Sequence, residues 1–197
     1  MDTKNLSLEE IEYKKRKYKA EKMLVWLLTF SVIMVFAGLT SAYIIRKESK
    51  DWRDFPLPNA YLLSTAVILL SSATMIFTIN LVKKNKLTLA KLSLFITLIL
   101  GVIFCVTQYQ GFYPLYNDNI HALGKNSQIA ASFLFALVFT HIGHLVLAMF
   151  GIIWTFFRLN RGAYSSEDYH GLQLCATFWH FMDILWVYLF LFLYFIR

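Results

Sequence analysis

Five long apolar segments restrict what this chain can fold into. They cover approximately residues 23–45, 60–82, 88–108, 128–157 and 171–196. A helix needs roughly 20 mostly apolar residues to cross about 30 Å of hydrocarbon, and each segment meets that length. No stretch long enough for a soluble domain lies between them. The sequence therefore predicts an all-α, polytopic membrane protein, built as a bundle of five transmembrane helices.

The charged residues exclude one class of partner. The chain is 58% hydrophobic and 16% charged, and 19 basic against 12 acidic residues give a net charge of +7. Nucleic-acid binding needs a basic face on a soluble domain, whereas these basic residues stand between apolar segments. We therefore predict no nucleic-acid partner and interpret the positive charge as a signal of membrane topology.

The distribution of Lys and Arg predicts the orientation. Seven precede the first apolar segment, four lie in the stretch KKNKLTLAK and two in RLNRG. The loops of the opposite side hold fewer, with four in RKESKDWR and one in residues 109–127. Because cytoplasmic loops carry the excess of basic residues, we expect a cytoplasmic amino terminus and an outer carboxyl terminus.

The chain divides into residues 1–22, a basic amphipathic cytoplasmic segment, and residues 23–197, the five-helix transmembrane domain. Ser7 followed by Glu10 matches a capping box, so a helix beginning there should run into the first span. The three prolines, at positions 56, 58 and 114, all fall in predicted loops. The spans should therefore be unbroken.

One carboxylate and three histidines lie inside the predicted spans. Asp183 is the only carboxylate there, and His141, His144 and His180 accompany it. Such groups are costly in hydrocarbon and normally face the bundle interior, where they pair. Helical rise places His144 roughly 20 Å and Asp183 roughly 18 Å from their shared loop, so the levels match. We expect a polar clamp between the last two helices, with Gly143 permitting close backbone approach.

Three interpretations of this polar clamp stay open. A metal site would use the same four residues, but the spacing is HxxH and lacks the glutamate of the zinc motif HExxH. A proton relay or transport site would also use them. A hydrogen-bonded clamp is favoured, because a histidine and an aspartate can satisfy each other's hydrogen-bonding groups without any additional residue. No other pattern predicts a catalytic, metal or cofactor site in this chain, and no haem ligand set is evident.

The last apolar segment also resembles a known family. HGLQLCATFWHFMDILWVYLFLFLY is similar to the final helix of subunit III of the haem-copper oxidases, whose signature is Trp-His-Phe-x-Asp followed by Trp. Trp179, Phe181 and Trp186 stand at the aromatic positions, with His180 and Asp183 between them. FALVFTHIGHLVLAMFGI resembles the preceding helix of that family. Five spans correspond to its short bacterial form.

The resemblance extends upstream, with three departures. MLVWLLTFSVIMVFAGLTSAYIIRK, LPNAYLLSTAVILLSSATM and LFITLILGVIFCVTQ look like the family's third, fourth and fifth helices. Val32 stands where the family commonly has a membrane-embedded glutamate, and Gln173 replaces another glutamate. The acidic residue often found after the fifth helix is missing around Gln110. Roles of those carboxylates therefore do not transfer to this chain.

The resemblance implies an accessory, non-redox subunit of a cytochrome c oxidase in a bacterial inner membrane. Such a subunit packs against catalytic subunit I, with subunit II in the same complex, encloses structural phospholipid and supports proton uptake. Haem and copper are then expected in the partner subunits and not in this chain. Subunit III of a quinol oxidase is the alternative within the family. A small transporter or proton channel built on the histidines is the alternative from another class.

One surface cluster is a candidate for proton collection. Glu167, Asp168 and His170 lie together in the predicted loop before the last span, on the cytoplasmic side. A histidine beside carboxylates can titrate near neutral pH, so this trio could gather protons. A solvated, charged loop without special function is the alternative.

Overall fold

The computed structural model consists of five helices. The structure describes residues 8–49, 52, 58–117 and 128–196. The helices are α1 (Leu8–Lys47), α2 (Ala60–Lys83), α3 (Leu87–Asn117), α4 (Ile129–Asn160) and α5 (His170–Ile196). Each is long and apolar enough to cross a membrane. The predicted all-α bundle of five spanning helices is thereby confirmed.

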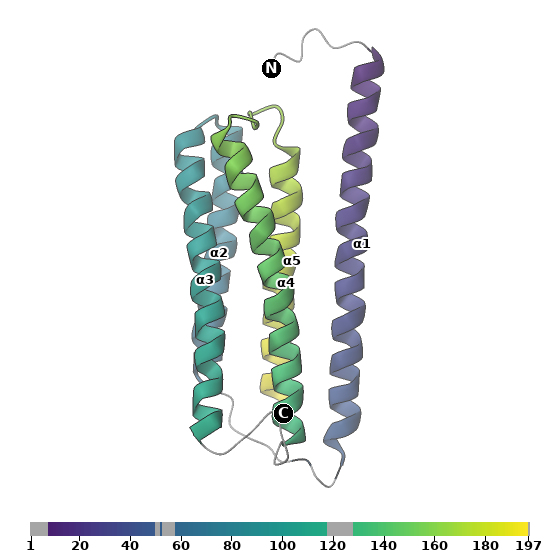
Figure 1. The fold of residues 1–197 in the computed structure, drawn as a ribbon, viewed down its shortest axis with the longest axis vertical. Coiled ribbons are helices and arrows are strands. Elements are labelled where there is room, and N and C mark those ends of the chain that lie inside the picture. Colours follow the sequence, from purple (N-terminus) through teal and green to yellow (C-terminus); the bar gives the residue numbers. More distant parts are fainter. Residues whose placement is uncertain (1–7, 50–51, 53–57, 118–127, 197) are drawn as a thin grey trace.

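The helices run alternately up and down (Figure 1). α2 and α3 form the most extensive contact of the bundle, and α5 packs against α1, α2 and α4. The turn between α2 and α3 is short because Asn85 adopts a left-handed conformation with φ 58°, which asparagine tolerates better than most residues. α1 stands at the edge of the bundle and contacts only α4 and α5 among the described helices.

A single seam attaches α1 to the rest of the protein. Its buried residues recur every three or four positions and therefore lie on one face; they are Thr29, Val32, Phe36, Thr40 and Tyr43. Most of the other apolar side chains of its span are exposed, as hydrocarbon permits, while Leu39 is partly buried against the core. Val32 is buried in this seam, so the position where the family commonly has a glutamate is filled here by an apolar packing residue.

The helices extend beyond the predicted spans. α1 is continuous from Leu8 into the first span, as expected, while Ser7, its predicted cap, lies outside the described residues. The prediction that all prolines lie in loops was wrong, because Pro114 lies inside α3. Pro58 does precede α2, and Pro56 lies outside the described part of the chain.

The continuation of α3 through Pro114 has a packing cause. Leu115 is buried and Phe112 packs against the core, so unwinding the chain here would expose both. The proline removes one backbone hydrogen bond near the helix end. Burial of the flanking side chains outweighs that loss, which a rule based on proline alone does not anticipate.

Hydroxyl groups join α2 to α3. The Thr78 hydroxyl donates to Ser93 Oγ at 2.9 Å, and the hydroxyls of Thr74 and Thr97 lie 2.8 Å apart. Such small polar residues let membrane helices approach closely and bond to each other. These bonds hold α2 and α3 together, and α5 packs against α2 of this pair.

Candidate functional site

Two consecutive residues of α5 bond two consecutive residues of α2. The Trp179 indole Nε1 donates to Ser71 Oγ at 3.1 Å, and His180 Nδ1 lies 2.7 Å from Ser72 Oγ. Trp179 and Ser71 are both completely buried. This register fixes the rotation of α5, since slipping by one residue would break both bonds.

The aromatic signature residues extend this attachment. The ring of Trp179 lies so close to Gly101 of α3 that a Cβ at that position would be 2.9 Å from Cη2. Trp186 Nε1 donates to Thr65 Oγ1 of α2 at 3.0 Å, and Phe181 packs against the core. The tryptophans of the predicted signature thus hold α5 against α2 and α3.

Asp183 is buried without full compensation. It is 2% exposed, and neither carboxylate oxygen has a hydrogen-bond partner among the described residues. The nearest ionisable group is His180, whose Nδ1 lies 3.9 Å from Asp183 Oδ2. That distance allows an electrostatic interaction but exceeds the length of a hydrogen bond. An unpaired buried carboxylate is costly in hydrocarbon and marks a candidate functional group.

The histidines of α4 do not bond directly to this pair. His144 Nδ1 lies 2.8 Å from the Thr140 carbonyl of its own helix. His141 is completely buried, with both ring nitrogens unpartnered among the described residues. The rings around His141 are those of Phe36, Phe104 and Trp186. The expected direct bond from α4 to His180 or Asp183 is therefore wrong, because matched depth does not fix the rotation of a helix. A link through one water stays a prediction.

The glycine expected to bring α4 close to α5 does not do so. A Cβ at Gly143 would meet nothing within 4 Å. The closer approach occurs at Gly151, where a Cβ would lie 3.7 Å from Cys175 Sγ. Gly143 and His144 are adjacent in the sequence, and the rotation of α4 that packs His141 inward leaves position 143 in open space.

The histidines and the aspartate do not form a metal-ligand set. No group of three or more His, Cys, Asp or Glu side chains comes together within the described ranges. Of the four predicted residues, His180 and Asp183 approach each other on α5, and His141 and His144 lie one turn apart on α4, where His141 is enclosed by aromatic rings. This donor geometry does not fit a metal ion, or a haem held by paired histidines.

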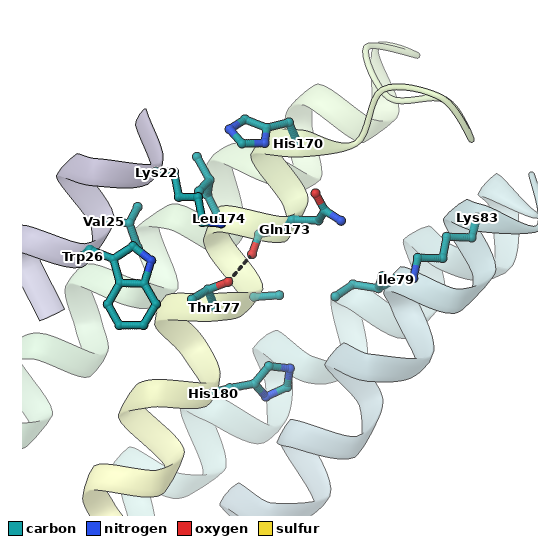
Figure 2. A pocket seen from close by; sticks show the side chains of 11 residues that line it. Lys22, Val25, Trp26, Ile79, Lys83, His170, Gln173, Leu174, Thr177 and His180 are labelled. Carbon is teal, nitrogen blue, oxygen red and sulfur yellow. Dashed lines mark hydrogen bonds between the residues drawn. The ribbon is translucent and has the colours of Figure 1, made fainter. Parts of the chain in front are cut away.

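A pocket of about 540 Å³ lies between α1, α2 and α5 and reaches His180 (Figure 2). A polar stripe of α5 lines it at intervals of three or four residues, consisting of His170, Gln173, Thr177 and His180. Lys22 of α1 and Lys83 of α2 stand on either side of the stripe. His180 belongs both to this pocket and to the pair with Asp183.

Sequence reasoning missed the pocket, although a signal was present. The positions of the polar stripe differ by three, four and three residues, which places them on one helix face. In the family comparison Gln173 marks only a replaced glutamate, and Thr177 belongs to no motif. The contribution of Lys22 and Lys83 could not be seen, because it depends on which helices stand beside α5.

The proposed proton-collecting loop is bound to the amino-terminal part of α1. Lys14 Nζ lies 2.6 Å from Asp168, and the Tyr18 hydroxyl donates to its carboxylate at 2.6 and 2.7 Å. Partial burial acts in the opposite direction, but the bonds from Lys14 and Tyr18 lower the pKa of Asp168 below its ordinary value. Asp168 therefore stays ionised near neutral pH and acts as an anchor.

The other two members of the loop trio are arranged differently. His170 stacks on Tyr18 with ring centroids 4.2 Å apart, and its Nε2 lies 3.7 Å from the carboxylate of Glu21. The backbone nitrogen of Glu167 donates to Ser165 Oγ at 3.3 Å. The structure thus brings Asp168 and His170 onto α1 through the shared contact with Tyr18.

A second groove runs along α1 alone, with a volume of about 530 Å³. Its lining combines two amines with an apolar wall and consists of Lys19, Lys22, Met23, Trp26, Leu27 and Phe30. Lys22 and Trp26 also line the first pocket, so they separate the two spaces. The first pocket is lined by several polar groups, whereas this groove has polar groups only at its lysine end.

Most of this chain matches a known protein family. Residues 53–197 match the family described as cytochrome c oxidase subunit III. That range contains α2 to α5 and both halves of the Ser71–Trp179 and Ser72–His180 pairs. α1 lies before it, so the resemblance of α1 to a family helix is not covered by this match.

Individual relatives carry two kinds of name. Cytochrome bo(3) ubiquinol oxidase subunit 3 of Buchnera aphidicola (subsp. Acyrthosiphon pisum) is 27% identical over 175 residues, covering 86% of this chain and 83% of that protein. Cytochrome c oxidase subunit 3 of Corynebacterium diphtheriae is 24% identical over 173 residues, covering 84% and 82%. The probable cytochrome c oxidase subunit 3 of Rickettsia conorii is 27% identical over 150 residues, and the chain spans only 49% of its length.

Proposed function

Because this chain belongs to the cytochrome c oxidase subunit III family and is thus an accessory subunit III of a haem-copper oxidase, we propose that its complex oxidises cytochrome c. The family match over residues 53–197 carries this proposal. The oxygen-reducing activity belongs to the assembly, and this chain stabilises the catalytic subunit. Relatives named as ubiquinol oxidase subunits make quinol the alternative donor.

Haem and copper belong to the partner subunits in this proposal. The donor geometry around His141, His180 and Asp183 supports it, because these groups do not converge on a common point. Subunit I is the main partner of this chain, and subunit II is part of the same complex. The exposed apolar faces of the five helices suit both helix partners and lipid.

The α1 groove is proposed to hold a phospholipid. Lys19 and Lys22 supply positive charge at one end, where a phosphate would lie at the membrane interface. Met23, Leu27 and Phe30 continue toward the apolar part of α1 and suit an acyl chain. Basic side chains above an apolar wall are the combination that an anionic lipid requires.

The chain is proposed to lie in a bacterial inner membrane with its amino terminus in the cytoplasm. The excess of Lys and Arg at that end supports the orientation. It places Glu167 and His170 on the side from which a respiratory oxidase takes up protons. Asp168 is held by Lys14 and His170 stacks on Tyr18, so the predicted trio would collect protons as a cluster attached to α1.

Purification of the tagged chain from its native membrane tests the assignment. We expect haem absorbance, copper and two larger subunits to copurify, and oxygen consumption to follow addition of reduced cytochrome c. An identical preparation from cells with the untagged chain is the control. Activity with quinol alone would overturn the proposed donor. A chain that purifies without haem and carries ions across liposomes would favour the transporter alternative.

A further inference from the structure

The pocket between α1, α2 and α5 ends beside a buried carboxylate that has no hydrogen-bond partner in the described part of the chain. We propose that His180 and Asp183 form a proton-exchange site, which water reaches through this pocket from the membrane side where Lys22 and Lys83 lie. The ligand of the site is a proton carried by water. The inference goes beyond the proposed oxidase function and does not depend on the identity of the electron donor.

The first step of the argument is access. Thr177, Gln173 and His170 continue from His180 along one face of α5 and offer hydroxyl, amide and imidazole groups to the pocket (Figure 2). Among the described residues α1 and α2 share no close contact, and α5 lines the space between them. A volume of about 540 Å³ is many times the roughly 30 Å³ that one water occupies in the liquid. Polar partners and room are the two conditions for stable internal water.

The second step is the junction between the pocket and the carboxylate. The side chain of His180 is 26% exposed, whereas that of Asp183 is 2% exposed. His180 Nδ1 lies 3.9 Å from Asp183 Oδ2 and 2.7 Å from Ser72 Oγ. The imidazole of His180 therefore both lines the pocket and lies beside the acid. A small rotation of either side chain would bring nitrogen and oxygen into hydrogen-bond range.

The proton reaches Asp183 in two successive transfers through His180. A hydronium ion that reaches the pocket through its water gives a proton to His180 Nε2, forming an imidazolium, and a neutral water remains in the pocket. The proton on Nδ1 then moves to the ionised Asp183 carboxylate, which leaves a neutral acid and a neutral imidazole of the other tautomer. The reverse sequence returns the proton. No net charge remains in the hydrocarbon after the transfer, which favours the neutral pair.

The titratable groups around the pair come from every helix that packs on α5. α1 contributes Lys22, α2 contributes Lys83, and α5 itself contributes His170, all lining the pocket. α4 contributes His141, whose ring packs against Trp186 one turn beyond Asp183. The positive charges of the two lysines repel other cations at the mouth of the pocket. In this proposal a proton therefore crosses the pocket by transfer from one water or polar side chain of the stripe to the next.

Infrared spectroscopy of the intact complex tests the proposal. The spectrum of the wild type minus that of Asp183→Asn should contain a protonated-carboxyl band, which moves on transfer to D₂O. The His180→Phe substitution removes the relay group and should slow the rate at which this band shifts in D₂O by about a hundredfold. That is the order of magnitude that a positioned proton-transfer group contributes. Thr177→Trp fills the pocket and should slow the shift as well. Ile184→Trp, at an exposed position of the same helix, is the matched control and should leave it unchanged.

The exchange rates of these variants distinguish a proton-exchange site from a buried carboxyl that water does not reach. Exchange that is slow in both His180→Phe and Thr177→Trp, and unchanged in the control, supports the site. A band that survives in Asp183→Asn, or exchange that neither pocket variant slows, overturns it. Labelling gives a second measurement that does not need Asp183 to be replaced. With Cys105 and Cys175 changed to Ser, Thr177→Cys should react with a charged thiol reagent added on the Lys83 side, and lack of reaction from that side would refute water access.

Discussion

Ser72 Oγ lies 2.7 Å from His180 Nδ1, so the histidine of the signature is fixed by α2 and not by the helix that precedes it in the chain. Its neighbour Trp179 is fixed in the same way by Ser71. These two contacts, made by consecutive residues on each helix, determine which face of α5 meets the bundle core and which face lines the pocket. The relation explains why a serine pair on one helix matters to a motif 108 positions later.

The two serine contacts should differ in their contribution to stability. Ser71→Ala leaves the completely buried indole N–H of Trp179 without its acceptor, which costs about 1–3 kcal/mol. Ser72→Ala affects a half-buried histidine and should cost about 0.6 kcal/mol, the average for hydrogen bonds between membrane helices. The temperature at which this chain dissociates from the purified complex measures both. Ser31→Ala, which removes only a bond to its own helix backbone, is the control; equal effects of all three would contradict the prediction.

Gly101 should tolerate no side chain. An added Cβ would lie 2.9 Å from Trp179 Cη2, and that ring is held in place by its bond to Ser71 and by complete burial. Gly101→Ala should therefore destabilise the bundle by about 1–3 kcal/mol, as overpacking does elsewhere. Gly143→Ala is the matched control, because a Cβ there meets nothing within 4 Å. Thermal dissociation of the chain compares the two variants, and a harmless Gly101→Ala would show that Trp179 can move.

The buried histidine of α4 should be replaceable by an apolar residue. His141 has no hydrogen-bond partner among the described residues and packs between aromatic rings. His141→Leu removes a buried polar group at a site that already suits a hydrophobe, so we expect stability to be unchanged or raised by up to about 1 kcal/mol. A loss of stability would instead show that water connects His141 to a polar partner, as the sequence-based clamp requires. Comparison with His180→Leu, which removes a bonded imidazole, calibrates the measurement.

The attachment of the α1 amino-terminal part should depend on pH through Asp168. The bonds from Lys14 and Tyr18 lower the pKa of Asp168 from its ordinary value of 3.8 despite partial burial. A carboxyl with a lowered folded-state pKa stabilises the folded state above its ordinary pKa, and that contribution disappears as the pH falls through the lowered value. The protection of the amides of residues 8–22, taken relative to their intrinsic exchange rate at each pH, should therefore be constant near neutral pH and fall only below about pH 4.

Substitution tests the same contact. Asp168→Asn should increase hydrogen exchange of residues 8–22 at neutral pH by up to about fivefold, since exposed ion pairs contribute less than about 1 kcal/mol. Arg16→Ala removes a charge from the same helix without touching the loop, because the partner of Arg16 is Glu12 one turn away. If Arg16→Ala had the larger effect, net charge and not the Asp168 contact would govern the attachment.

Local signals in the sequence were sufficient for the membrane architecture. Each of the five apolar segments is long enough to span the bilayer by itself, and a helix satisfies its own backbone within one segment. The signature around Trp179 and Asp183 likewise identified the family without knowledge of any contact. The error at Pro114 arose because a local rule for proline ignores the burial of its neighbours Phe112 and Leu115.

The partners of the polar residues were decided only by the tertiary structure. Matched depth along α4 and α5 suggested that His144 would meet Asp183, but depth fixes position along a helix axis and leaves rotation about it free. The rotation is set by packing over the whole helix length, here by Trp179 against Gly101 and by the two serine bonds to α2. That packing turns His180 toward Ser72 and the pocket, and leaves Asp183 as a buried acid beside it.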